Sequence, residues 1–156
     1  MKTTSIRDLL ARQPVLCDLE AADIDLIAGC AHNEVVEPWT FLAREGDPAD
    51  RFFVLRAGKV ALAVQAPTGP LVVETLGPGD LVGWSWLFPP YRFTYDIEAV
   101  ERTRMVTVEA ACLVAKCDQD PAFGYRLMKR FSQVLVERLY AARLRLLDLY
   151  GGRVAD

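Results

Sequence analysis

Apolar and polar residues alternate with a period of two through the middle of the chain, from residue 34 to residue 110. Turn-forming residues separate the short alternating runs, as at residues 46–48 and 77–80. β-Branched residues, which strands prefer, are frequent in these runs, as at Val54 and Val106. Many short strands with regularly spaced turns are typical of a sandwich or barrel. The pattern therefore predicts a mainly β region over residues 34–110.

The two flanking segments have helical periodicity instead. Residues 5–12 and 19–30 are expected to form short helices. Towards the C-terminus, a short helical piece leads into a long last helix. Asp120 can cap the first turn of that helix, and Pro121 suits its first position, where the missing N–H is not needed. Gly151-Gly152 can supply a left-handed stop.

The last helix carries a heptad seam, because mostly apolar residues recur in it at alternating spacings of four and three. The seam consists of Met128, Ser132, Leu135, Leu139, Ala142, Leu146 and Leu149. A second apolar set consists of Leu127, Phe131, Val134, Leu144 and Leu147. The helix is thus apolar on more than one side, so one face can pack on the β region while the other meets a partner. We expect a homodimer through this helix.

Length and composition fit a single domain over residues 1–156, and a hydrophobic content of 52% argues against disorder. The net charge of −3 is uneven, since residues 123–153 hold 7 basic and 2 acidic side chains. We interpret this basic helix as a solvated face that complements an acidic β region, with nucleic-acid binding as the alternative. Without an apolar run of about 18 residues or a secretory apolar core, no membrane contact is expected, and a cytoplasmic location is the default.

The four cysteines, Cys17, Cys30, Cys112 and Cys117, include no Cys-x-x-Cys pair. They are expected to be free and mostly buried thiols, with redox sensing by Cys112 and Cys117 as the alternative. The single histidine, His32, lies in a segment predicted to be helical or near a helix end. One imidazole argues against a metal-binding jelly roll, so neither a metal nor a cofactor is predicted.

Catalytic motifs are incomplete. Gly83-Trp84-Ser85-Trp86-Leu87 begins like a nucleophile elbow, but Leu87 replaces the second glycine of that motif. No Gly-Lys-Ser/Thr phosphate loop and no dinucleotide fingerprint occur in the sequence. The chain is therefore not expected to be an enzyme.

Residues 77–99 have a glycine frame, made by Gly79, Asp80, Gly83 and Ala99, that resembles the phosphate-binding cassette of the cyclic-nucleotide-binding domain. We call this segment the cassette. The Glu-Gly-Asp-Pro-Ala-Asp corner and Gly-Lys-Val hairpin within residues 41–60 are similar to the same family.

The resemblance implies a fold, which is an eight-stranded jelly roll (double-stranded β-helix) flanked by helices. It divides the single domain into N-terminal helices over residues 1–33, a β jelly roll over 34–110 and C-terminal helices over 111–151. Catabolite-activator (Crp/Fnr-type) transcription factors use this fold as their effector domain. Their DNA-reading element follows the long helix, so a chain ending at Asp156 is expected not to bind DNA directly.

The two charged residues that hold the usual ligand are replaced. Trp84 takes the place of the glutamate that accepts from the ribose, and Phe93 falls where the phosphate-binding arginine would be. Arg92 is one position out of register, which turns its side chain to the opposite face of a strand. We therefore expect weak or no binding of cyclic AMP and cyclic GMP. The predicted pocket residues are Gly83, Trp84, Ser85, Trp86, Arg92, Phe93, Thr94 and Tyr95.

Two functions remain open at this point. In the first, an open pocket binds an unidentified small molecule and the chain is a regulatory sensor. In the second, aromatic side chains fill the pocket, and the aromatic loop or the helix binds a protein partner. The run from Gly83 to Arg92 also resembles stand-alone relatives associated with redox enzymes such as hydrogenases, which implies an accessory role there.

Overall fold

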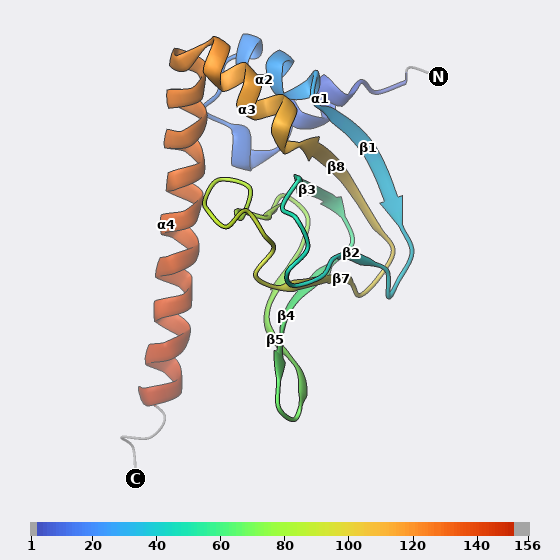
Figure 1. Cartoon of the computed structure of the whole chain (residues 1–156), viewed down its shortest axis with the longest axis vertical. Coiled ribbons are helices and arrows are strands. Elements are labelled where there is room, and N and C mark those ends of the chain that lie inside the picture. Colours follow the sequence, from blue (N-terminus) through green and yellow to red (C-terminus); the bar gives the residue numbers. More distant parts are fainter. Residues whose placement is uncertain (1–2, 152–156) are drawn as a thin grey trace.

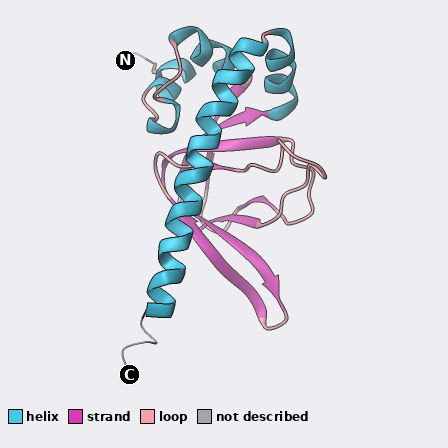
Figure 2. Ribbon diagram, turned by 90° about the vertical axis from the view of Figure 1, so that its left-hand side faces the viewer, coloured by secondary structure: helices cyan, strands magenta, loops and turns pink. Residues whose placement is uncertain are grey.

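The computed structural model describes residues 3–151, and its eight strands form two four-stranded antiparallel sheets (Figures 1 and 2). The strands are β1 (Ala31–Val36), β2 (Phe41–Ala43), β3 (Arg51–Ala57), β4 (Val60–Ala66), β5 (Gly69–Leu76), β6 (Leu81–Val82), β7 (Asp96–Ala99) and β8 (Thr103–Glu109). One sheet has the order β1-β8-β3-β6 and the other β2-β7-β4-β5. The mainly β fold predicted from the alternating pattern is confirmed, as is the jelly roll implied by the family resemblance.

Helices occupy both ends of the chain. They are α1 (Ile6–Ala11), the 3-10 helix η1 (Pro14–Leu16), α2 (Ala21–Ala28), α3 (Ala110–Gln119) and α4 (Pro121–Gly151). Figure 1 shows α1, α2 and α3 gathered at one end of the sheets, with α4 running down one side. The Asp120 carboxylate accepts the N–H of Phe123 at 3.1 Å, so the predicted cap of the long helix is present. Gly152 lies outside the described residues.

The core lies between the sheets and continues under the helices. Phe52 and Phe53 of β3 are neighbours in sequence and are both buried, although their side chains leave opposite faces of the strand. Both faces of β3 are therefore covered. Towards the helices the core continues through Leu10, Ile27 and Phe123, all of which are buried.

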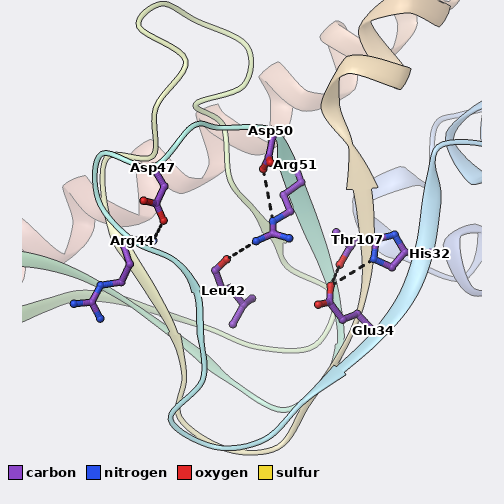
Figure 3. A network of polar contacts seen from close by, with 8 residues as sticks. All are labelled: His32, Glu34, Leu42, Arg44, Asp47, Asp50, Arg51 and Thr107. Atoms are coloured by element: carbon purple, nitrogen blue, oxygen red, sulfur yellow. Dashed lines mark hydrogen bonds and ion pairs between the residues drawn. The ribbon is translucent and has the colours of Figure 1, made fainter.

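The first strand begins at Ala31, earlier than the sequence indicated, and it includes His32. The expectation that His32 lies in or near a helix end was wrong, because β1 pairs with β8, a contact remote in sequence that places His32 opposite Thr107. Figure 3 shows the result: Glu34 accepts the Thr107 hydroxyl at 2.6 Å, and its carboxylate lies 3.7 Å from His32 Nε2.

The expectation that all four cysteines are free was also wrong. Cys30 and Cys112 form a disulfide, with their Cα atoms 5.6 Å apart across 82 residues of sequence. Cys17 and Cys117 are the free thiols, and Cys17 is exposed rather than buried. The spacing of cysteines in the sequence gave no sign of the pair, because it is tertiary packing that brings the start of β1 to α3.

Candidate ligand pocket

A cavity of about 280 Å³ lies between the cassette, the β2-β7-β4-β5 sheet and α4. Six of the eight predicted pocket residues line it, namely Gly83, Trp84, Ser85, Phe93, Thr94 and Tyr95. The remaining lining residues are Leu62, Glu74, Ile97, Leu135, Arg138 and Leu139. The cassette and the long helix therefore form two walls of one site.

Gly83 sets the direction of the chain as it leaves β6. Its φ of +102° lies in a region that side-chain-bearing residues rarely adopt, which accounts for a glycine at this position. After it, the N–H of Leu87 donates to the carbonyl oxygen of Trp84 at 3.0 Å and closes a single turn. No helix forms between β6 and β7.

The two tryptophans of the cassette have different surroundings. Trp86 is buried and stacks on Phe52, with ring centroids 5.1 Å apart, so it belongs to the core rather than to the pocket. Trp84 is half-buried and lines the cavity, with its ring 6.0 Å from that of Phe131. Phe93 is only 5% exposed, yet the cavity remains beside it. The aromatic side chains therefore narrow the pocket without closing it.

Arg92 points away from the cavity. Its guanidinium donates to the carbonyl oxygen of Gly46 at 2.8 Å on the exposed side of the loop. The neighbouring Phe93 exchanges backbone hydrogen bonds of 2.8 and 2.9 Å with Gly46 and Asp47. The Asp47 carboxylate in turn accepts the Arg44 N–H at 3.0 Å (Figure 3). The Glu-Gly-Asp-Pro corner thus fixes the end of the cassette and holds Arg92 outside the site.

A cation that the sequence reading missed enters the cavity from α4. Arg138 donates to the carbonyl oxygen of Leu81, and its guanidinium lies 5.3 Å from the centroid of the Trp84 ring. Burial lowers the pKa of Arg138 below its usual value, while Glu74 and Asp80 oppose that shift. The signal was present in the sequence, because Arg138 follows Phe131 and Val134 at helical spacing and so falls on the stripe that faces the β region.

Glu74 is the second charged residue missed. It lies on β5 opposite Leu62 of β4, and both side chains line the cavity. Its neighbours Val72 and Val73 are exposed, so the strand carries no clear alternation from which an inward-facing carboxylate could be read. The cavity therefore contains a guanidinium and a carboxylate contributed by different elements.

Residues 34–120 match the model of the cyclic nucleotide-binding domain, which is more than half of the chain. The chain belongs to the cyclic nucleotide-binding domain family. Its cavity lies between the segment that resembles the family's cassette and the long helix that follows the β strands.

This cyclic nucleotide-binding domain is similar in sequence to a transcriptional regulator. It is 29% identical over 116 residues to a CRP-like cAMP-activated global transcriptional regulator of Mycobacterium tuberculosis, a match that covers 71% of this chain and 50% of that protein. The chain thus spans about half the length of that curated relative. Among solved structures, the fold matches a cyclic nucleotide-binding domain from Methylobacillus flagellatus with a TM-score of 0.77, 18% identity and coverage of 92% and 81%. The N-terminal domain of a transcriptional regulator from Streptomyces coelicolor matches with a TM-score of 0.69, 24% identity and coverage of 86% and 94%.

The predicted seam runs along the side of α4 in this domain that is only partly covered. Met128, Leu135 and Ala142 are half-buried. The exposed seam residues are Ser132, Leu139, Leu146 and Leu149. Leu135 and Leu139 also line the cavity, so the seam and the pocket share residues. Of the second apolar set, Leu127, Phe131 and Val134 are buried, whereas Leu144 and Leu147 are exposed.

The described residues contain neither a candidate metal site nor a candidate membrane-spanning helix. Residues 3–151 bring no three histidine, cysteine or acidic side chains together as a metal would need. Within the same residues, no helix has both the length and the apolarity that crossing a bilayer requires.

Proposed function

We propose that this cyclic nucleotide-binding domain is a non-catalytic regulatory module that binds a small molecule in the cavity and transmits binding through α4. The observation that carries the proposal is the composition of the cavity wall. Leu135, Arg138 and Leu139 of α4 face a site whose other wall is the cassette. A ligand in this site contacts both elements, so its affinity depends on where α4 lies. That dependence is the condition for a conformational readout.

The expected ligand is not cyclic AMP or cyclic GMP bound in the usual way. Trp84 and Phe93 offer neither a carboxylate nor a cation, and Arg92 bonds Gly46 outside the cavity. Loss of a buried charge-assisted pair costs about 2–5 kcal/mol, or about 30- to several-thousand-fold in affinity. Isothermal titration with either nucleotide is expected to show no saturation up to tens of micromolar. A sub-micromolar dissociation constant would contradict this account of the site.

A thermal-shift panel of nucleotides, redox cofactors and aromatic metabolites tests the proposed module. A compound present at a hundred times its dissociation constant stabilises the folded state by about 2.7 kcal/mol. Thr94→Trp is the matched variant, because Thr94 is exposed but lines the cavity. An indole ring at this position would narrow the site without entering the core. At least one compound should stabilise the wild type and not Thr94→Trp. If every active compound stabilises both proteins equally, the cavity is not the site.

The proposed module is a homodimer joined by the α4 seam. Support comes from the large apolar side chains that the C-terminal half of α4 leaves exposed to solvent, including Leu146 at 52% and Leu149 at 71% exposure. A second copy of this domain would bury the exposed seam residues of both copies at once, because residues spaced by three and four meet their equivalents across a two-stranded coiled coil.

An accessory role through a protein partner is the second candidate. The cassette loop favours it, because Phe88 and Tyr91 are 60% and 52% exposed although both are large and apolar in body. A redox enzyme such as a hydrogenase is the partner that the resemblance of residues 83–92 suggests. Phe88→Ala together with Tyr91→Ala would abolish this binding while leaving every response to the small-molecule panel intact.

A further inference from the structure

The walls of the cavity suit a flat ligand. Trp84 and Phe93 contribute aromatic rings, and Leu135 and Ile97 contribute aliphatic side chains. Ligand pockets usually measure about 300–1,000 Å³, so a cavity of about 280 Å³ lies just below that range. It suits one or two fused rings better than a base, a sugar and a phosphate together.

Arg138 has donors to spare for such a ligand. A guanidinium carries five N–H donors, and among the described residues Arg138 has one hydrogen-bond acceptor, the carbonyl oxygen of Leu81. Its planar group lies over the Trp84 ring, and a carboxylate or another paired acceptor beside it would be bound by two parallel hydrogen bonds. Since burial disfavours the charged form of Arg138, an acceptor partner would compensate part of that cost.

The carboxylates near Arg138 limit which acceptors fit. Asp80 is already engaged, because its carboxylate accepts the N–H of Gly77 at 2.9 Å. Glu74 lines the cavity together with Arg138. Both carboxylates attract Arg138 and oppose a purely anionic ligand. A cyclic phosphate would bring a second negative charge beside Glu74, whereas a ligand that also carries a donor would pair with it.

We infer that the cavity selects an amphoteric aromatic molecule, whose acidic group binds Arg138 and whose ammonium or N–H group binds Glu74. The inference rests on the proposed function, because it names the ligand class of the same cavity. It assigns recognition to α4 and β5 instead of to the cassette, where the charged pair has been replaced by Trp84 and Phe93.

Three indole compounds test the contacts to Arg138 and Glu74 one at a time. L-Tryptophan carries both an ammonium and a carboxylate, indole-3-acetate only the carboxylate, and tryptamine only the ammonium. Isothermal titration of the full chain should show L-tryptophan binding about ten-fold or more tighter than either single-charge probe, since each lost charged hydrogen bond costs about that much. Glu74→Gln should weaken L-tryptophan by a similar factor and leave indole-3-acetate unchanged or tighter. Arg138→Gln should weaken L-tryptophan and leave tryptamine unchanged.

Folding of each variant is checked by circular dichroism, and Arg138→Lys, which keeps the charge without the planar fork, replaces Arg138→Gln if the latter unfolds. Equal or tighter binding of indole-3-acetate to the wild type overturns the inference, as does a binding pattern insensitive to Glu74→Gln. If no indole compound binds but another panel compound does, and Thr94→Trp abolishes it, the ligand class is wrong while the sensor function stands. If nothing in the panel stabilises the wild type, both fail.

Discussion

The two halves of α4 have similar apolar content but different surroundings. In the first half Phe123, Leu127 and Phe131 are buried against the sheets and the N-terminal helices. In the second half Leu144 and Leu147, at 44% and 64% exposure, face solvent. Figure 2 shows the helix crossing the sheets and continuing alongside the β4–β5 hairpin.

The difference shows that periodicity alone does not say what an apolar stripe contacts. The first half belongs to the core because α3 and η1 contact it and because Phe131 packs against Phe52 of β3. The second half has no comparable cover among the described residues, and Arg138 lies where the two halves meet. A residue at that boundary contacts the cavity and begins the exposed segment, so ligand binding and partner binding on α4 are expected to be coupled.

The largest expected effect is in the buried half. The Phe131 ring lies 5.6 Å from that of Phe52 and 6.0 Å from those of Trp84 and Trp86. Phe131→Ala would empty this aromatic cluster and lower the free energy of unfolding by about 3–5 kcal/mol. Leu147→Ala in the exposed half should change it by about 0.5 kcal/mol or less. Urea unfolding measures both, and similar losses for the two variants would erase the distinction between the halves.

The disulfide beside the buried half is expected to have the next largest effect. Cys30–Cys112 ties the start of β1 to α3 across 82 residues, so it restricts the unfolded chain. Cys112→Ser should lower the free energy of unfolding by about 2–4 kcal/mol without reductant. In dithiothreitol the wild type and the variant should become equally stable. Cys117→Ser is the control, because Cys117 is a free thiol, and a Cys112→Ser loss that persists in reductant would mean that packing explains it.

The fold could be predicted from the sequence where the physical signal is local. Period-two alternation located the β region, and Asp120 with Pro121 located the start of α4, since a cap depends on residues within one turn. The start of β1 could not be predicted, because the strand forms by pairing with β8, more than seventy residues away. The disulfide between Cys30 and Cys112 could not be predicted either, because its two cysteines are 82 residues apart in sequence.

The cassette wall of the pocket was predictable and the opposite wall was not. Glycine positions and a family resemblance placed Gly83, Trp84 and Phe93 beside one cavity. Helical spacing puts Arg138 on the stripe of α4 that faces the β region, but only tertiary packing brings that stripe, and Glu74 of β5, to the cassette. Trp86 was predicted to line the pocket as part of the cassette, but it stacks on Phe52 and belongs to the core.

A smaller effect is expected from the ion pair that anchors the buried half to α2. The guanidinium of Arg126 donates to the Asp23 carboxylate at 2.7 and 2.9 Å, and these hydrogen bonds hold the pKa of Asp23 below its usual value. Because Arg126 is partly exposed, Asp23→Asn should cost only about 1–2 kcal/mol at neutral pH.

The pH dependence of that cost has a definite sign. A lowered folded-state pKa means that the stabilisation is fully present above the unfolded pKa of about 3.9 and is lost as pH falls through the folded value. The difference between wild type and Asp23→Asn should therefore be constant from about pH 7 to 5 and shrink below about pH 4. Asp25→Asn, which removes an exposed pair with Arg7, is the control and should cost about 0.5 kcal/mol or less. A difference that stays constant into acid would exclude the ionised pair as its cause.

The smallest effect on folding, and the most informative for the exposed half, is expected from Leu146→Glu. Leu146 lies in the seam beyond the cavity, so a charge there leaves the pocket and the core intact and should change the free energy of unfolding of the monomer by about 0.5 kcal/mol or less. In the proposed dimer the same charge would be buried opposite its copy, which disfavours association. Sedimentation should therefore show a dimeric wild type and a monomeric Leu146→Glu. Leu144→Glu is the matched control, because Leu144 is similarly exposed but lies on the other side of the helix from the seam, and it should remain dimeric. A wild type that is monomeric at micromolar concentration, or two variants that dissociate equally, would show that the exposed half of α4 is covered by something other than the same seam of a second copy.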